Sequence, residues 1–360
     1  MDAIDAVLVE LGPESIQLLA HHSHALPTAL RARLDALCTP GEHLQDAVDL
    51  LGSADRQLGE VLAEAATALL EKAAFPHSRV QAIGSHGQTI RHRPPDATTE
   101  WPFSLQIGDP NVLAARTGIP VVADFRRRDL ASGGQGAPLV PPFHHAAFRD
   151  AECVRAIVNI GGISNITLLP KDGAVLGFDA GPGNRLMDAW IQRHLGRPFD
   201  ADGSWAAAHE PHPELLAHLQ THPFLARQPP KSTGREDFHL DWVDSLLAQG
   251  PPIAAGRVQA TLLEFSATAI ASALIGLSPA VDEIYLCGGG ACNEALVERL
   301  RHLLQPRPVA TTAALGLAPE WVEGVAFAWL ARETLLGRCG NLPSVTGATQ
   351  AAVLGAIHQP

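Results

Sequence analysis

One stretch decides the fold of this chain: Val158-Asn159-Ile160-Gly161-Gly162-Ile163-Ser164-Asn165-Ile166-Thr167-Leu168-Leu169. Two apolar, β-branched runs flank a pair of glycines, which predicts a β-hairpin whose turn lets backbone N–H groups approach a ligand closely. Soon after comes Gly177-Phe178-Asp179-Ala180-Gly181-Pro182-Gly183-Asn184, with Asp179 at the end of an apolar run. A glycine nest for phosphate beside a half-buried acid indicates phosphoryl transfer with general-base help. The same residues also fit a purely structural hairpin and turn, and these motifs alone do not decide.

Length, composition and charge limit the class of protein. The chain has 360 residues, more than the roughly 250–300 at which a single core stops growing, which predicts two domains. Its 46% hydrophobic and 18% charged residues are typical of a soluble globular protein. A formal net charge of −12 argues against a broad surface for nucleic acid or anionic membrane.

Cysteine usage and the apolar runs predict a soluble, cytoplasmic protein. The five cysteines are odd in number and scattered, which argues against a disulfide framework. The opening Met1–Asp5 is acidic rather than basic then apolar, so it does not read as a signal peptide. The longest apolar run, Phe265–Leu277, is too short to span a bilayer. We therefore expect neither a membrane nor a nucleic-acid partner.

The order of elements predicts an α/β protein with two lobes. Strand and helix patterns alternate in both halves, and each half opens on a hairpin. We expect an N-terminal lobe over 1–150, joined by the C-terminal segment 337–360, and a second lobe over 151–336. Nucleotide would bind in a cleft between them, at glycine turns from both lobes. The region Asp200–Asp241 is rich in Pro, His and Gly and is expected to be irregular.

Four other motifs indicate ligand binding, some more specifically than others. Gly288-Gly289-Gly290 separates a predicted strand from a predicted helix, and three glycines favour nucleotide contact over a plain turn. Lys231–Glu236 lacks the glycine spacing and preceding strand of a P-loop, although it can still contact substrate or phosphate. His86 lies between glycines at a strand end and suits the lining of a polar pocket. Arg126 follows a strand and suits a carboxylate or phosphate, whereas surface pairing explains its arginine neighbours.

Together these motifs resemble one family, the bacterial anhydro-N-acetylmuramic acid kinases. The resemblance runs from about Asp2 to the C-terminus, and the motifs occur in the family's order. They are Ser85–His92, Asp124–Arg126 with Gly133–Leu139, Asn159–Gly162, Phe178–Asn184, Lys231–Glu236, Cys287–Ala291 and Asn341–Ala348.

The resemblance implies a two-domain actin/hexokinase/Hsp70-like (ASKHA) fold with a central cleft, and a homodimer. It implies a kinase that uses ATP and Mg²⁺ to convert 1,6-anhydro-N-acetylmuramic acid to N-acetylmuramic acid 6-phosphate in peptidoglycan recycling. Asp179 matches the family's general base, which activates a water at the anomeric carbon while O6 takes the phosphoryl group. Glu323 matches a sugar-contacting glutamate, and Arg126 and His86 belong to the substrate side. Residues expected to hold ATP are Asp2, Gly161, Gly162, Gly288, Gly289 and Gly290, with Asp2 also as a Mg²⁺ ligand.

The N-terminus departs from the family pattern. The family opens with a strand and a Gly-Thr-Ser-x-Asp-Gly-x-Asp phosphate loop, of which Met1–Asp5 fits only the end, with Ala3 at the last glycine position. We therefore expect that the start was assigned too late, that the first strand and phosphate loop are missing, and that the chain as written is unstable and inactive. Two alternatives follow: a kinase for another amino sugar, and a catalytically impaired sugar-binding protein of the same fold.

Overall fold

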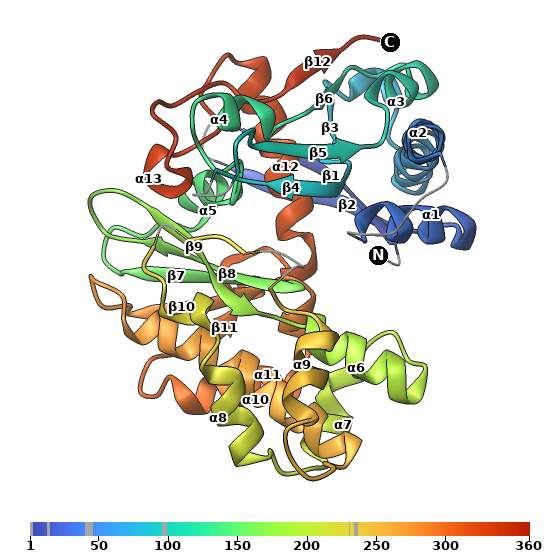
Figure 1. The fold of residues 1–360 in the computed structure, drawn as a ribbon. Coiled ribbons are helices and arrows are strands. Elements are labelled where there is room, and N and C mark those ends of the chain that lie inside the picture. Colours follow the sequence, from blue (N-terminus) through green and yellow to red (C-terminus); the bar gives the residue numbers. More distant parts are fainter. Residues whose placement is uncertain (1–2, 13–14, 40–45, 96–98, 230, 234–236) are drawn as a thin grey trace. The chain divides into compact units, whose positions relative to one another are not determined.

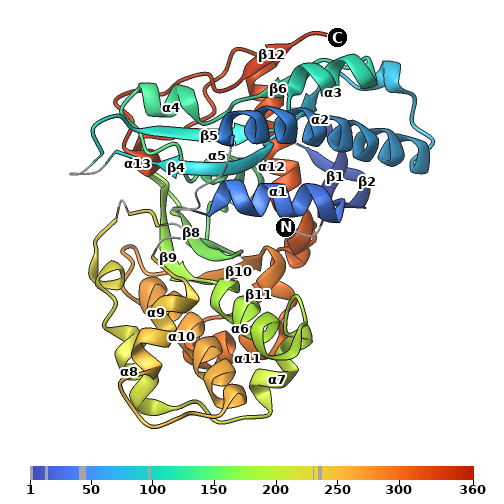
Figure 2. The ribbon, with the colours of Figure 1, turned by 45° about the vertical axis from the view of Figure 1, so that its right-hand side comes forward.

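The structure is a computed structural model that describes residues 3–12, 15–39, 46–95, 99–229, 231–233 and 237–360. It divides into two compact units, shown as ribbons in Figures 1 and 2. The first, unit 1, comprises residues 1–143 and 323–360, and the second, unit 2, comprises residues 144–322. Each unit is described by itself below.

Unit 2 is built on a five-stranded sheet that contains the predicted hairpin. The strand order is β11-β10-β7-β8-β9. β7 and β8 pair antiparallel with Ile160 opposite Ser164, which confirms the Gly161–Gly162 hairpin. β9 pairs antiparallel with β8, whereas β10 runs parallel to both β7 and β11. The strand bounds are β7 Arg155–Ile160, β8 Ile163–Leu169, β9 Leu176–Pro182, β10 Glu283–Cys287 and β11 Val309–Thr311.

Helices cover one face of this sheet. Alternate residues of β7, such as Ala156, Val158 and Ile160, are fully buried in one core cluster with side chains of α6, α10 and α11. This period of two is what a strand with one face on a helical layer requires. The helices are α6 Arg185–Leu195, α7 Ser204–Ala207, α8 Pro213–Gln220, α9 Leu240–Leu247, α10 Ala255–Ile275 and α11 Glu294–Leu303, with 3₁₀ turns at Ala201–Gly203, Pro223–Ala226, Gly289–Cys292, Thr312–Leu315 and Pro319–Trp321.

The region 200–241, which we expected to be irregular, is helical in part, so that prediction is confirmed only for the described residues between its helices, such as 227–229, 231–233 and 237–239. α7 and α8 both lie within it, and α9 begins at its end. Pro213 occupies the first turn of α8, where a missing N–H costs nothing. His212 Nδ1 accepts from Leu215 N at 3.3 Å and so caps the same helix. His212 and Pro213, two of the residues that suggested a loop, are therefore helix-start residues.

The described residues of unit 1 form three small sheets. β1 and β2 form the antiparallel hairpin predicted at the N-terminus. β6 lies between β12 and β3, and β4 pairs with β5. The strand bounds are β1 Ala3–Leu11, β2 Ile16–Ala25, β3 Ile83–Gly84, β4 Gln88–Arg93, β5 Phe103–Ile107, β6 Val121–Ala123 and β12 Ala356–His358.

The helices of unit 1 include one that the sequence placed in the other lobe. We set the boundaries at 150/151 and 336/337, whereas the units divide at 143/144 and 322/323. The reason is packing, because Phe327 and Leu330 of α12 share a core cluster with Val122 and Phe125. The helices are α1 Thr28–Cys38, α2 Ala47–Lys72, α3 Pro110–Thr117, α4 Arg127–Ala131, α12 Val322–Leu335 and α13 Pro343–Thr346, with a 3₁₀ turn at His77–Arg79. α5 Pro141–Phe148 crosses the first unit boundary, and α12 crosses the second after its first residue.

One helix of the described residues has the length and composition of a membrane span. It is α10, with a mean hydropathy of 1.5 over its most apolar window. Most of that window, 78%, is buried inside the protein, as in the core helix of a globular domain. The apolar run Phe265–Leu277 seen in the sequence thus lies mostly in the C-terminal half of this helix.

Candidate functional site

In unit 2, Asp179 lies on β9 and is held by main-chain groups of Lys231 and Thr233. It lies opposite Asn165 of β8, next to a β-bulge in which Ala180 is the extra residue. A bulge redirects the side chains beside it and is common next to active sites. The backbone N–H of Asp179 donates to Lys231 O at 3.0 Å, and one carboxylate oxygen, Oδ2, accepts from Thr233 N at 2.9 Å. The half-buried acid expected from the sequence is therefore fixed in direction.

The two glycine motifs of the sequence meet in space. The carbonyl of Gly161 accepts from Asn184 N at 2.8 Å, and that of Gly162 accepts from Gly183 N at 3.0 Å. The hairpin turn is therefore tied to the chain between β9 and α6, a few residues beyond Asp179. Asn184 Oδ1 is buried and has no hydrogen-bond partner within the described part of the chain. A buried acceptor of this kind is where a ligand or water is expected to donate.

The space around each glycine shows whether packing requires it. We compare the distance from a Cβ atom placed at each position to its nearest neighbours. At Gly288 it would lie 2.3 Å from Asn159 Oδ1, and at Gly290 2.3 Å from Ile160 Cγ2. These two glycines are required by close packing against the end of β7. At Gly161, Gly162 and Gly289 the closest atoms are 3.5, 3.6 and 4.0 Å away, with no left-handed backbone. Nothing in the described chain requires glycine at these three positions, which fits backbone approach to a ligand.

In unit 1, His86 and Arg126 form a fixed pair. His86 Nδ1 donates to Gly87 O at 2.9 Å, which leaves Nε2 to accept from Arg126 Nε at 3.0 Å and Nη2 at 2.9 Å. Arg126 Nη1 also donates to Gly136 O at 2.8 Å. The His86 ring packs on Phe327, with centroids 4.6 Å apart. Burial, and then the charge of Arg126, lower the pKa of His86 to about 3, so the ring is neutral at ordinary pH.

Glu323, the third residue predicted to bind the substrate, also lies in unit 1. It belongs to the first turn of α12, and the glycine after it packs on Val7, whose Cγ2 would be 3.2 Å from a Cβ there. The side chain is exposed by area, yet the surrounding protein displaces enough water to raise its pKa. Desolvation is the main cause of that rise, Arg126 opposes it, and Asp5 adds to it. The Arg126 charge therefore reaches both His86 and Glu323.

A buried aspartate supports Arg126, and the sequence analysis missed it. Asp129 is fully buried, and its carboxylate accepts from Gly136 N at 2.8 Å, Asn341 Nδ2 at 2.7 Å and Thr346 Oγ1 at 2.7 Å. Gly136 is the same residue whose carbonyl holds Arg126. Asp129 thus joins the motif after β6 to Asn341–Ala348, which had no role from sequence. Both segments were noted in the sequence as separate motifs, but nothing in the sequence indicated that they contact each other.

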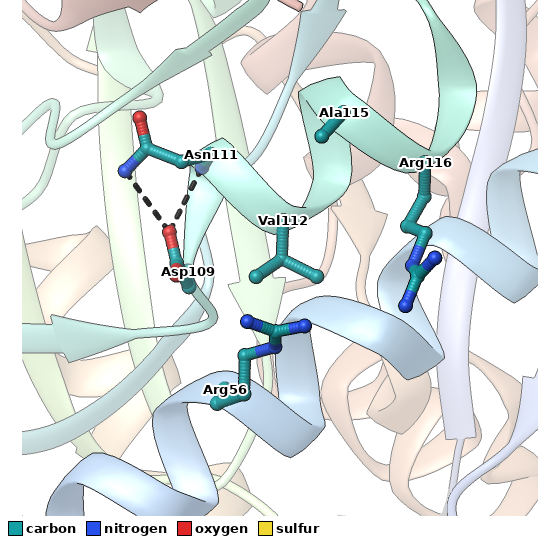
Figure 3. A pocket seen from close by; sticks show the side chains of 6 residues that line it. All are labelled: Arg56, Asp109, Asn111, Val112, Ala115 and Arg116. Carbon is teal, nitrogen blue, oxygen red and sulfur yellow. Dashed lines mark hydrogen bonds between the residues drawn. The ribbon is translucent and has the colours of Figure 1, made fainter.

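One pocket of unit 1 lies apart from these residues. It has a volume of about 350 Å³ and lies between α2 and α3, which run side by side (Figure 3). Arg56, Asp109 and Arg116 are among its lining residues. Both arginines bond to Glu60, at 3.1 Å from Arg56 Nη2 and 2.7 Å from Arg116 Nε, so their charges are partly neutralised. None of the predicted site residues lines it.

Asp2, predicted for both ATP and Mg²⁺, lies outside the described residues. Among the described residues no group of three His, Cys, Asp or Glu side chains is arranged to hold a metal ion. The Mg²⁺ site therefore stays a prediction.

These features define a class of protein first: a two-unit α/β enzyme with a directed carboxylate and glycine turns open to a ligand. A family model for anhydro-N-acetylmuramic acid kinase matches residues 1–360. A protein of that description from Shewanella halifaxensis is 51% identical over 359 residues, covering 99% of this chain and 95% of the relative. One from Saccharophagus degradans is 48% identical over 360 residues, covering 100% and 96%.

The chain belongs to the anhydro-N-acetylmuramic acid kinase family. With its two α/β units, this membership places it in the actin/hexokinase/Hsp70-like fold class. Likeness to solved structures is weak. The (R)-2-hydroxyglutaryl-CoA dehydratase component A from Acidaminococcus fermentans has a TM-score of 0.44 at 11% identity, covering 90% of this chain and 96% of that one.

Proposed function

We propose that this chain is an ATP-dependent kinase that opens 1,6-anhydro-N-acetylmuramic acid by hydrolysis and phosphorylates its O6. The product is N-acetylmuramic acid 6-phosphate, an intermediate of peptidoglycan recycling. The observation that carries the proposal is the Asp179 carboxylate, fixed by Thr233 N on a strand whose end is tied to the open Gly161–Gly162 turn. The family match over the whole chain supports it.

Asp179 is proposed as the general base. Its carboxylate takes a proton from a water whose oxygen forms a bond to the anomeric carbon C1. The C1–O6 bond breaks, its electron pair goes to O6, and O6 bonds to the terminal phosphorus of ATP while the bond from that phosphorus to the bridging oxygen breaks and ADP leaves. A positioned base contributes about 10²–10⁴-fold to such a step, and the remaining rate comes chiefly from positioning and charge stabilisation.

The nucleotide is proposed to bind at the turns of unit 2. Gly161, Gly162 and Gly289 have room around them that their own chain does not use, so their N–H groups suit phosphate oxygens. Gly288 and Gly290 are proposed to act indirectly, because they let this turn pack against the end of β7. ATP, when bound, supplies the phosphoryl group that O6 accepts.

The sugar is proposed to bind through side chains of unit 1. The substrate carries a lactyl carboxylate, and a guanidinium such as Arg126 pairs with a carboxylate through charge-assisted hydrogen bonds. His86 donates to Gly87 and accepts from Arg126, so we propose that it contributes chiefly by orienting Arg126. Glu323 is proposed to bind a hydroxyl or amide of the sugar.

The alternatives are less well supported. Family membership over the full chain favours the anhydro sugar over another amino sugar. An impaired sugar-binding protein has no need for open glycine turns beside a directed carboxylate. The homodimer and Mg²⁺ stay predictions of the resemblance, and the cytoplasmic location stays a prediction from cysteine usage.

A comparison of two substrates tests the proposal. The purified chain is incubated with ATP and Mg²⁺ and either 1,6-anhydro-N-acetylmuramic acid or N-acetylmuramic acid, and the products are identified by mass spectrometry. We expect a 6-phosphorylated sugar from the anhydro substrate and at least tenfold less from the open sugar. Preference for the open sugar would favour an ordinary amino-sugar kinase. Product from this chain would contradict the inactivity expected from its N-terminus, whereas sugar binding without product from either substrate would favour the binding protein.

A further inference from the structure

The segment Lys231–Thr233 lies along β9 and touches Asp179 at two points. Lys231 O accepts from the backbone N–H of Asp179 at 3.0 Å, and Thr233 N donates to the Asp179 carboxylate at 2.9 Å. One contact fixes the strand position of the acid and the other fixes its side chain. The segment belongs to the motif whose P-loop interpretation we rejected, so no function had been assigned to it.

The Lys231 side chain is unusual because it is buried. Only 8% of the residue is exposed, and long charged side chains rarely reach this burial unless they are paired. Its Nζ donates to Leu225 O at 3.3 Å and Phe224 O at 3.4 Å, and lies 4.6 Å from the centre of the Phe224 ring. Lys231 is thus anchored in the core of unit 2, between the turn at Pro223–Ala226 and β9.

The charged groups around Asp179 favour an electrostatic role for this lysine. Burial lowers the pKa of Lys231, the Asp179 carboxylate raises it, and Arg227 lowers it again. Asp237 is bonded to the Thr233 hydroxyl and so is already occupied. On α10, which packs on β9, Glu264 is paired with Arg299 at 2.6 Å. Lys231 is therefore a buried cation close enough to Asp179 for the two charges to act on each other.

We propose that Lys231 is a positioning residue for the Asp179 base: its buried ammonium anchors the segment whose main-chain groups, Lys231 O and Thr233 N, hold the backbone and the carboxylate of Asp179. This inference rests on the proposed function, because it needs Asp179 as the base. A nearby positive charge lowers the pKa of a carboxylate by about 1–3 units. Removal of that charge raises the pKa of Asp179, so the base is lost at a higher pH than in the parent chain.

Four variants test the inference: K231M, K231Q, K231R and, as a matched control, K171M. Lys171 is an exposed lysine of the same unit, 3.8 Å from Asp282. The measurement is the pH profile of kcat/KM for the anhydro sugar, with the melting temperature of each variant. K231M and K231Q should move the acid limb up by about one pH unit and lower kcat roughly tenfold. K231R should restore the acid limb, and K171M should leave both quantities unchanged.

The outcomes separate this inference from the proposed function. If K231M and K231Q keep the parent acid limb while D179N is inactive, the positioning role is overturned and the base stands. If D179N retains the parent rate, the proposed function fails instead. Should K231M fail to fold, K231Q decides, since its amide can still donate to the Phe224 and Leu225 carbonyls. Failure of both neutral variants to fold would assign Lys231 to folding and overturn its positioning role.

Discussion

The two units hold their candidate site residues by different means. In unit 2 the contacts are mostly main chain: glycine turns, a strand bulge and the N–H that binds Asp179. In unit 1 they are mostly side chain: His86 orients Arg126, and buried Asp129 holds the loop to which Arg126 is bonded. Substitution should therefore act through backbone space in unit 2 and through hydrogen-bond partners in unit 1.

The largest effect on stability is expected at Asp129. Its buried carboxylate accepts three hydrogen bonds, and bonds to a charged group contribute about 1.5–3 kcal/mol each. In D129N one carboxylate oxygen is replaced by an NH₂ group, which faces a hydrogen-bond donor and cannot accept from it. The free energy of unfolding should therefore fall by about 3 kcal/mol. Urea unfolding measures this change. D172N, at an exposed position, serves as control and should stay within about 0.5 kcal/mol; an equal effect in both would contradict the account.

Two glycines of one turn offer a sharper comparison. In G290A the new methyl group would overlap Ile160 Cγ2, and such overpacking costs about 1–3 kcal/mol of unfolding free energy. G289A meets no atom closer than 4.0 Å, so its stability should hold while the KM for ATP rises about tenfold. Thermal unfolding and ATP titration separate the two. Equal destabilisation by both changes would mean that packing alone explains the motif.

This contrast also shows what could be predicted from sequence. The hairpin at Gly161–Gly162 and the half-buried Asp179 were predictable because turn chemistry and apolar runs are local signals. The different reasons for Gly289 and Gly290 were not, because they depend on Ile160 of another strand. Asp129 was missed since its partners Asn341 and Thr346 lie more than 200 residues away. In region 200–241 the residues His212 and Pro213 start a helix, a use of these residue types that composition does not reveal.

The buried histidines make stability depend on pH in both units. The folded pKa is about 3 for His86 in unit 1 and about 3 for His144 in unit 2, against an ordinary value of 6.5. Below pH 6.5 the unfolded chain binds protons that the folded chain excludes, so stability falls as pH decreases toward 3. Each histidine should contribute about 1.4 kcal/mol per pH unit in this window.

Denaturant unfolding between pH 7 and 4 measures this slope. H144Q should reduce the slope by about one proton, whereas H218Q, at an exposed helix position, should leave it unchanged. A slope that is the same in H144Q and the parent chain would contradict a neutral buried His144.

The smallest effect is expected at Arg126. R126K keeps the charge but cannot reproduce the planar fork that bonds His86 and Gly136. The KM for the anhydro sugar should rise about tenfold, equivalent to about 1.4 kcal/mol, while the KM for ATP stays the same. R128K, a neighbour in the same basic run, is the matched control. A rise in both KM values would show that Arg126 supports the fold rather than the sugar.

The central claim is that Asp179 activates a water whose oxygen becomes the anomeric hydroxyl. The direct test is turnover of 1,6-anhydro-N-acetylmuramic acid with ATP and Mg²⁺ in ¹⁸O-labelled water, followed by mass spectrometry. Unlabelled product kept in the same water measures background exchange. The account predicts a 6-phosphorylated sugar with one ¹⁸O at its anomeric hydroxyl, formed about 10²–10⁴-fold more slowly by folded D179N. Product without ¹⁸O above background, or formed equally fast by D179N, would contradict it.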